Sequence, residues 1–430
     1  MAPKIAIIGG GSAYAPGLIH AFIQEAAAFQ GAELALMDLA AEQLETVAAL
    51  AQKMAAAAGA DLTITATTDR RAAVAGADYV LTTFRQGGFA ARHLDESIPL
   101  KHGVIGQETI GPGGFFFAMR TLPVIRGLLA EMEELAPRAV LVNYSNPTQI
   151  VAEAVAHFSR VPCISICDQS RDDQKTILHA LGRPDAHVVL ESIGLNHATW
   201  STRFEIDGED GVAVMTQALD AVLAREDVSA RTKRQFRLAA EYGRLPNSYM
   251  QYYYFRDETV AEAQAAPQTR AQAIMDAIPG YYAHFQEQLA AETPRLTHVR
   301  GGSLFGDMAV EVLRGLVQQD GSIHTLNVPN RGALPDFAPD RVVEVPARLE
   351  RRGATPLVQD PLPSAVTGLL KMLADYQWLA AEAIWQGDRP ALDRALAANP
   401  LVLSLPPARR LLDEMIPLQA AYVDARVRSQ

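Results

Sequence analysis

The sequence predicts an α/β protein with a Rossmann-like, doubly wound parallel sheet in its N-terminal part and an α+β region in its C-terminal part. Two observations support this: short apolar runs alternate with helical patterns over the first 170 residues, and the first run leads into a glycine-rich turn. The 430 residues are 49% hydrophobic and 20% charged. This balance predicts a folded protein of one large or two fused domains.

Strand and helix patterns alternate in the N-terminal part. Lys4 to Ile8 is typical of a buried parallel strand, and residues 16–29, with Pro16 in the first turn, are typical of a helix. The other predicted strands are 33–37, 62–65, 79–83, 139–144 and 163–167, and the other helices are 44–58, 115–135 and 147–158. This order favours a parallel sheet with helices on both faces.

The pattern changes after about Ser170. The predicted strands here are 186–192, 200–206 and the short apolar run 342–345; the predicted helices are 214–224, 261–292 and several within 364–427. Pro267 and Pro279 are expected to break or kink the second of these helices. We therefore predict a domain of residues 1–170 and an α+β domain of residues 171–430.

Composition excludes several classes of protein. Lys and Arg number 38 against 49 Asp and Glu, a net charge of −11, which disfavours binding to nucleic acid or an anionic membrane. Two cysteines, Cys163 and Cys167, make no disulfide framework. The N-terminal apolar run is too short for a signal peptide, and charged residues interrupt every candidate membrane span. We expect a soluble cytoplasmic protein.

The first strand and turn predict a dinucleotide site. Gly9, Gly10, Gly11 and Ser12 follow the strand and precede a helix, so the backbone can approach a pyrophosphate at a helix N-terminus. Asp38 ends the second strand, where its carboxylate can bind an adenosine ribose and repel a 2′-phosphate. The third glycine of the usual pattern is replaced by Tyr14, but the combination favours NAD+ over a purely structural turn.

Two segments at strand ends carry candidate substrate-binding residues. The segment from Arg85 to Gly114, which includes Arg92, is expected to be a long functional loop beside the cofactor. Asn146 precedes a proline at the end of a strand. A helix cap and a substrate hydrogen bond are equally supported for Asn146 by spacing alone.

Cys167 and His197 also lie at predicted strand ends. One thiolate and one imidazole can hold a divalent metal with positions open for a substrate, although a lone Cys or His is more often a core residue. The run from Leu245 to Tyr254 is rich in tyrosine. Such a run usually packs in a core, but an ionised Tyr near a cation can act as a base.

In combination these segments resemble glycoside hydrolase family 4, the NAD-dependent glycosidases. The resemblance covers nearly the whole chain. It is carried by the following motifs: Gly9-Gly-Gly-Ser12, Asp38, Gly87-Gly88 with Arg92, Asp95 to Lys101, Gly106 to Gly114, Asn143-Tyr-Ser-Asn-Pro147, Gly194-Leu-Asn-His197, Pro246 to Tyr253 and Val342 to Pro346. In this order they are highly specific, and they imply a lactate/malate dehydrogenase-like fold.

The resemblance also implies roles for individual residues. Cys167 and His197 resemble the ligands of a metal, usually manganese. Asp168 resembles the general acid of the phospho-α-glucosidase branch. Tyr249 resembles the catalytic base, with Tyr252 and Tyr253 as alternatives. Arg92 and Asn146 resemble residues that contact the sugar.

The implied reaction is redox-neutral. NAD+ takes a hydride from C3 of the sugar, the base removes the C2 proton, the aglycone leaves, water adds, and the hydride returns. Such enzymes lie outside the usual scheme of two catalytic carboxylates. A substrate with an anionic C6 group, above all a 6-phospho-glucoside, is expected; Ser12, Arg92, Lys101 and Arg270 are candidates to bind that group.

The sequence departs from both phosphoglucosidase branches after the cysteine. The α branch usually continues Cys-Asp-Met-Pro and the β branch Cys-Asn-Val-Pro, whereas this chain has Asp168-Gln169-Ser170. The alternatives are therefore a related NAD-dependent sulfoquinovosidase or an unphosphorylated α-glycosidase. A plain NAD-dependent 2-hydroxy acid or sugar dehydrogenase and a non-catalytic NAD-binding protein are more distant. Family members are usually dimers or tetramers, which implies a homodimer or homotetramer here.

Overall fold

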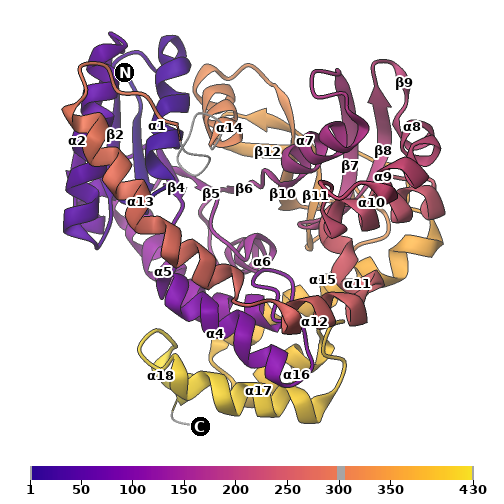
Figure 1. Ribbon diagram of the computed structural model, residues 1–430. Helices are drawn as coiled ribbons and strands as arrows, with labels where there is room; N and C mark the ends of the chain where they lie inside the picture. Colours follow the sequence, from indigo (N-terminus) through magenta and orange to yellow (C-terminus); the bar gives the residue numbers. More distant parts are fainter. Residues whose placement is uncertain (1, 298–305, 429–430) are drawn as a thin grey trace.

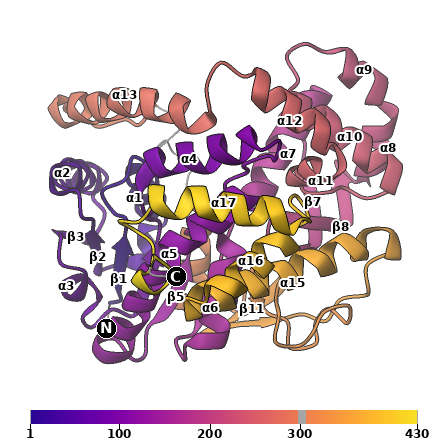
Figure 2. The ribbon, with the colours of Figure 1, turned by 90° about the horizontal axis from the view of Figure 1, so that it is seen from below.

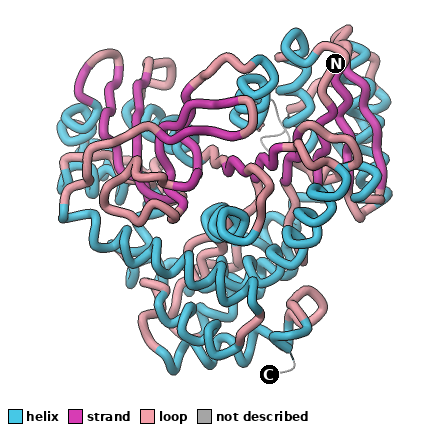
Figure 3. The backbone as a smooth tube through the Cα atoms, turned by 180° about the vertical axis from the view of Figure 1, so that it is seen from behind, coloured by secondary structure: helices cyan, strands magenta, loops and turns pink. Residues whose placement is uncertain are grey.

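The computed structural model describes residues 2–297 and 306–428. Within these residues one sheet runs through the whole molecule in the order β3-β2-β1-β4-β5-β6-β10-β11-β7-β8-β9, and β12 pairs with β11. Figure 3 shows the strands passing from one side of the molecule to the other. The boundary proposed near residue 170 thus falls within a continuous sheet, and the division into two domains stays a prediction.

The N-terminal half of the sheet is parallel throughout. Its strands are β1 (Lys4–Ile8), β2 (Ala32–Met37), β3 (Leu62–Thr67), β4 (Tyr79–Thr82), β5 (Val140–Asn143) and β6 (Cys163–Ser165). The order β3-β2-β1-β4-β5-β6 is that of a dinucleotide-binding sheet. The predicted parallel sheet is confirmed.

The remaining strands are antiparallel. They are β7 (Val188–Leu195), β8 (Ala198–Ile206), β9 (Glu209–Asp210), β10 (Ile323–Pro329), β11 (Val342–Glu350) and β12 (Gly353–Pro356). The junction between the two halves is a bridge between Asn327 of β10 and Ser165 of β6. The sequence did not predict β10, because its C-terminal end lies in a Pro- and Gly-rich stretch.

Helices flank the parallel half and form a layer beneath the sheet (Figures 1 and 2). Those of the first half are α1 (Ala15–Gln24), the 3-10 helix η1 (Ala26–Phe29), α2 (Ala41–Ala57), α3 (Arg70–Val74), α4 (Gly88–Lys101), α5 (Pro112–Leu135), α6 (Thr148–Phe158) and α7 (Gln169–Leu181). Those of the second half are α8 (Gly211–Gln217), α9 (Leu219–Ala224), α10 (Ala230–Tyr242), the 3-10 helix η2 (Ser248–Met250), α11 (Gln251–Tyr254), α12 (Arg256–Ala265), α13 (Arg270–Ala290), α14 (Asp307–Gln318), α15 (Ser364–Gln386), α16 (Arg389–Ala398), α17 (Leu405–Leu418) and α18 (Ala425–Arg428). Among the described residues, no helix is both long enough and apolar enough to cross a bilayer.

Two expectations about these helices need correction. The segment 85–114 is not a loop, because α4 occupies its centre. The sequence of α4 is rich in polar residues, so its apolar positions do not form a clear helical pattern. Of the two prolines in 261–292, Pro267 lies in the break between α12 and α13, whereas Pro279 lies inside α13. The helix predicted over this range is therefore two helices.

Helix α13 connects the two halves of the chain. It packs along α4 and α2, and Figure 1 shows it crossing from the α12 side of the molecule to the N-terminal sheet. Lys53 Nζ of α2 donates to the carbonyl of Leu289 at 2.7 Å, and the Tyr282 hydroxyl donates to the carbonyl of Gly11 at 2.7 Å. An element of the second half thereby reaches the glycine-rich turn of the first.

A buried carboxyl group in the core predicts a pH dependence of stability. Glu153 of α6 is fully buried, accepts the Val342 N–H of β11 at 2.8 Å and lies 3.4 Å from the Nδ1 atom of His157. Burial raises the pKa of Glu153 from its ordinary 4.5 to about 8, against the opposing effect of the Val342 hydrogen bond. The folded chain therefore holds a proton that the unfolded chain releases, and this contribution to stability is lost as the pH rises from about 5 to about 8.

Glu153→Gln is expected to remove this dependence. At pH 8 the variant should be more stable than the wild type by up to about 4 kcal/mol, since the pKa of Glu153 rises from 4.5 to about 8 and one unit of pKa corresponds to about 1.4 kcal/mol. Urea unfolding at pH 5 and pH 8 measures the difference. Asp257→Asn, at a side chain that is 95% exposed, is the control. An unchanged pH profile in Glu153→Gln would contradict the expectation.

Candidate functional site

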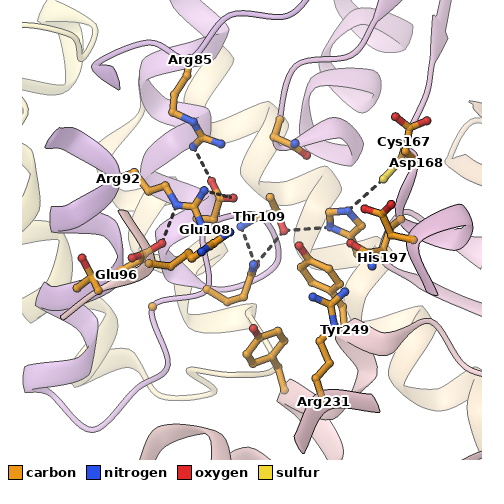
Figure 4. A pocket seen from close by; sticks show the side chains of 18 of the residues that line it. Arg85, Arg92, Glu96, Glu108, Thr109, Cys167, Asp168, His197, Arg231 and Tyr249 are labelled. Atoms are coloured by element: carbon orange, nitrogen blue, oxygen red, sulfur yellow. Dashed lines mark hydrogen bonds and ion pairs between the residues drawn. The ribbon is translucent and has the colours of Figure 1, made fainter. Parts of the chain in front are cut away.

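A cavity of about 1130 Å³ lies at the carboxyl ends of the parallel strands. The loops after β4, β5 and β6, the β7–β8 turn, η2 and the start of α13 all contribute to it. Its lining includes most of the residues singled out in the sequence: Arg92, Asn146, Cys167, Asp168, His197, Tyr249, Tyr252 and Arg270. Figure 4 shows several of these side chains converging.

Cys167 and His197 meet in this cavity. Cys167 Sγ and His197 Nε2 are 3.2 Å apart, although 30 residues separate them in the chain. Metal–ligand bonds of about 2.0–2.3 Å that meet near a right angle place two ligand atoms about 3 Å apart, so the pair fits one shared ion. In the described ranges no group of three or more His, Cys, Asp or Glu is placed to hold a metal. An ion bound by this pair would keep positions open for other ligands.

Hydrogen bonds around His197 fix the tautomer that a metal needs. Thr109 Oγ1 donates its proton to Gln107 Oε1 at 2.8 Å, so it can only accept from His197 Nδ1, 3.0 Å away. The hydrogen then sits on Nδ1 and leaves the lone pair of Nε2 facing Cys167. Burial lowers the pKa of His197 to about 3 and raises the pKa of Cys167 to about 12. Metal binding would therefore displace one proton, from the thiol.

The turn that carries His197 is held in an unusual conformation. His197 has φ +62°, a region that non-glycine residues rarely adopt and that is often functional where it occurs. Asn196 anchors the turn, because its side chain donates to Glu344 Oε2 at 2.8 Å and its backbone N–H donates to Gln149. A Cβ atom at Gly194 would lie 2.5 Å from the Ala198 carbonyl oxygen, so only glycine fits there.

Tyr249 lies directly against His197. Its ring stacks on the His197 ring with centroids 4.1 Å apart and planes inclined by 16°. The Arg231 guanidinium lies 4.9 Å from the Tyr249 centroid. Burial raises the pKa of Tyr249, and the charge of Arg231 opposes that rise.

The other two candidate tyrosines lie in different surroundings. Tyr252 also lines the cavity and meets Tyr249 edge-on, with centroids 5.8 Å apart. Tyr253 packs against the main hydrophobic core instead, and its buried hydroxyl has no hydrogen-bond partner among the described residues. Of the three, Tyr249 is the one in contact with His197.

Asp168 follows Cys167 and precedes α7. Its Oδ1 atom is buried and has no hydrogen-bond partner within the described part of the chain. Burial raises the pKa of Asp168 to about 7, against the opposing charge of Arg171. The carboxyl group can therefore hold a proton near neutrality, as a general acid requires.

The glycine-rich turn has the predicted form. Gly9 has φ +101°, and a Cβ atom there would lie 2.7 Å from the backbone of Thr83, so the turn packs tightly on the end of β4. Asp38 Oδ2 accepts the Gly11 N–H at 3.1 Å, which places the carboxylate beside the turn. The Ser12 hydroxyl oxygen is buried without a partner among the described residues. These features suit a dinucleotide.

The charged candidates differ in how far their charge is already neutralised. Arg92 is ion-paired with Glu96 at 2.6 Å and with Glu108 at 3.1 Å. Arg270 is exposed at the first residue of α13 and lines the cavity. Lys101 is paired with Glu414 at 3.6 Å and is not among the lining residues.

Of the two roles that spacing left open for Asn146, the structure shows a contact at the start of a helix, and the substrate hydrogen bond stays a prediction. Asn146 lines the cavity, and its Oδ1 atom accepts from the backbone N–H (3.3 Å) and the hydroxyl (3.1 Å) of Thr148 at the start of α6. This contact therefore uses the side-chain oxygen.

Sequence reasoning missed several residues around the site. Thr109 lies within the segment 85–114, but its sequence context indicates no role, and none is indicated for Arg231, Asp173 or Tyr282. Arg231 and Asp173 lie on helices with ordinary polar patterns, and Tyr282 approaches Gly11 from 271 positions away. No local motif marks such contacts.

Comparisons with known proteins show the family of this chain. Residues 4–183 match the model of family 4 glycosyl hydrolases, and residues 192–402 match that of the family 4 C-terminal domain. A probable 6-phospho-beta-glucosidase of Bacillus subtilis (strain 168) is 34% identical, over 98% of this chain and 97% of its own.

Solved structures are similar over the same length. One is a 6-phospho-alpha-glucosidase from gut microorganisms in complex with NAD and Mn2+: 25% identity, TM-score 0.87, coverage of 98% of this chain and 99% of that one. Another 6-phospho-alpha-glucosidase from gut microorganisms, in complex with NAD and glucose-6-phosphate, shares 28% identity with a TM-score of 0.86 and covers 99% of each chain. A malate dehydrogenase of Plasmodium falciparum, at 14% identity and TM-score 0.52 over 89% of this chain and 99% of its own, shares the fold. The family models together span most of the chain in sequence order, and the chain belongs to family 4 of the glycosyl hydrolases.

Proposed function

We propose that this protein hydrolyses a 6-phospho-glucoside with the help of NAD+ and a divalent metal ion, Mn2+ above all. The observation that carries the proposal is the convergence of Cys167, His197, Asp168 and Tyr249 in one cavity at the carboxyl edge of a dinucleotide-binding sheet. Relatives named as phosphoglucosidases, and similar structures in complex with NAD, Mn2+ and glucose-6-phosphate, support it.

Four groups of residues have separate roles in this proposal. Gly9, Gly10, Gly11, Ser12 and Asp38 would hold NAD+, and Cys167 with His197 would hold the metal. When bound, NAD+ supplies reversible hydride transfer at C3, and the metal polarises the sugar oxygens O2 and O3. Tyr249 removes the C2 proton, and Asp168 donates a proton to the departing aglycone oxygen. Arg92, Asn146 and Arg270 bind the sugar and its C6 group.

Three further features belong to the proposal. Residues 1–170 form the NAD-binding domain, and residues 171–430 form the domain for substrate, metal and oligomerisation. Arg92, Asn146 and Cys167 of the first domain contribute to the same cavity. The protein works in the cytoplasm as a homodimer or homotetramer. An α-linked substrate is favoured by Asp168, although the relative at 34% identity is named for the β activity.

Hydrolysis of a small panel of p-nitrophenyl glycosides tests the function. The panel contains α- and β-glucosides with a hydroxyl, phosphate or sulfonate at C6, each with and without NAD+ and Mn2+ under reducing conditions. Release of p-nitrophenol from a 6-phosphate that requires both additions is the expected result. Preference for the sulfonate would identify a sulfoquinovosidase, and lasting NADH production without hydrolysis would indicate a dehydrogenase.

Thr109 is expected to control metal affinity. Thr109→Val removes the acceptor for the His197 Nδ1 hydrogen, and losses of such outer partners typically cost about 10–100-fold in metal affinity. Thr109→Ser keeps the hydroxyl and is the matched control. Isothermal titration calorimetry with Mn2+ measures the dissociation constants of the two variants. Equal affinities of the two variants would contradict the role given to Thr109.

Asp168→Asn separates acid catalysis from the other steps. Proton donation matters most for a poor leaving group, so the variant should lose about 10²–10⁴-fold in kcat on an alkyl glucoside and much less on the p-nitrophenyl glucoside. The slope of log kcat against the leaving-group pKa measures this. A slope as flat as that of the wild type would remove the general-acid role.

A further inference from the structure

A buried carboxylate on α7 binds the segment that carries Tyr249. Asp173 is 4% exposed. Its Oδ2 atom accepts the backbone N–H of Ser248 at 2.9 Å, and its Oδ1 atom accepts the Ser248 hydroxyl at 2.6 Å. Ser248 is the residue immediately before Tyr249, so both of its donors fix the backbone from which the tyrosine projects.

The same carboxylate gathers polar groups from two helices. Gln235 of α10 donates to Oδ2 at 3.1 Å, and Gln169 of α7 donates to Oδ1 at 2.7 Å. Gln235 also donates to the Pro246 carbonyl at 2.8 Å, which ties α10 to the same segment. Asp173 therefore connects α7, α10 and the residues that lead into η2.

Arg231 extends this network to the ring of Tyr249. Its Nε atom donates to Ser248 Oγ at 2.8 Å, and its guanidinium lies 3.6 Å from Asp173 Oδ1. The guanidinium carbon lies 4.9 Å from the centroid of Tyr249, whose ring also stacks on His197 at 4.1 Å. Figure 4 shows the Tyr249 ring between these two groups.

The network begins directly after Cys167 and Asp168. Cys167 and Asp168 precede α7, Gln169 is its first residue, and Asp173 lies one turn further on. One short segment thus carries a candidate metal ligand, the candidate acid and two residues that bind Ser248, the residue before the candidate base.

We propose that Asp173, acting through Ser248 and Arg231, is a positioning residue that holds the Tyr249 ring against His197 and aims its hydroxyl at the reacting carbon. The inference rests on the proposed function, in which Tyr249 removes the C2 proton. Asp173 does not line the cavity. A displacement of the base by about 1 Å can cost about 10²-fold in rate, so loss of Asp173 should slow proton removal specifically.

Asp173→Asn tests this with the p-nitrophenyl 6-phospho-glucoside that the wild type cleaves, in protonated form and deuterated at C2 or at C3. We expect kcat to fall about 10–100-fold with KM changed by less than about threefold. The isotope effect at C2 should increase and that at C3 should decrease, because proton removal becomes more rate-limiting. The dissociation constant of NAD+ should stay near the wild-type value.

A second variant and a control complete the experiment. Ser248→Ala removes the hydroxyl that joins Asp173 to Arg231 and should show the same changes in the isotope effects. If Asp173→Asn does not fold, this variant tests the role of the network in its place. Asp220→Asn, at an exposed carboxylate of α9, should match the wild type.

The outcomes distinguish the inference from the function on which it rests. Wild-type protein that does not exchange the C2 proton with solvent deuterium during turnover would refute the proposed function itself. If the wild type exchanges, then an unchanged kcat in the variants, or a fall with the C2 isotope effect unaltered, would overturn the role of Asp173 alone.

Discussion

Cys167→Ser and His197→Ala are each expected to abolish metal binding and to reduce hydrolysis by about 10³-fold or more. A bound divalent ion contributes several kcal/mol of transition-state stabilisation, and about 1.4 kcal/mol corresponds to a tenfold change in rate. Their donor atoms lie 3.2 Å apart and together present one soft and one nitrogen ligand. Serine keeps the size of the thiol but binds the ion poorly, and alanine removes the imidazole altogether.

Binding of NAD+ should survive both substitutions. The glycine-rich turn and Asp38 belong to β1, β2 and their loops, whereas Cys167 and His197 follow β6 and β7. Calorimetric titrations with Mn2+ and with NAD+ separate the two sites. Cys163→Ser, at the other end of β6, is the matched control, since that side chain contacts Ser165 and does not line the cavity. A parallel loss of NAD+ affinity in Cys167→Ser would count against two separate sites.

The parallel half of the fold could be predicted from the sequence because its central strands, such as β1 and β5, are almost continuous apolar runs. Strands such as Ile5 to Ile8 are covered on both faces, so their composition alone identifies them. The helix α4 and the strand β10 were not predicted, because neither has a clear apolar pattern in the sequence. Ion pairs such as Arg92 with Glu96 stabilise α4 without a strong apolar stripe, and β10 becomes part of the sheet only by pairing with β11 and β6.

The candidate site shows the same division between local and distant information. The residues at the strand ends could be named because a parallel sheet brings its carboxyl edges together. The supporting contacts could not, because they join segments far apart in the chain: Thr109 to His197, Asp173 to Ser248 and Tyr282 to Gly11. Sequence patterns report the elements that carry a functional group, whereas the orientation of that group depends on tertiary packing.

Tyr249→Phe is expected to abolish exchange of the substrate C2 proton with solvent deuterium and to lower kcat by about 10²–10⁴-fold, the usual contribution of a general base. The phenyl ring keeps the 4.1 Å stacking on His197, so that metal and NAD+ binding should persist. Hydride transfer at C3 does not require the hydroxyl. The variant should therefore still reduce bound NAD+ in a single turnover, visible as NADH absorbance, while proton exchange followed by NMR is lost.

The neighbouring tyrosines provide the controls for this experiment. Tyr253→Phe removes a hydroxyl that is buried in the main core and should leave exchange and turnover unchanged. Tyr252→Phe changes a cavity residue whose ring meets Tyr249 edge-on, and it should retain exchange with a moderately altered KM. Persistent exchange in Tyr249→Phe together with its loss in Tyr252→Phe would transfer the base to Tyr252. The Tyr249 ring stacks on His197, the Tyr252 ring contacts Tyr249, and both residues line the same cavity. That result would therefore assign the base to another residue of this cavity and leave the metal-binding role proposed for Cys167 and His197 unchanged.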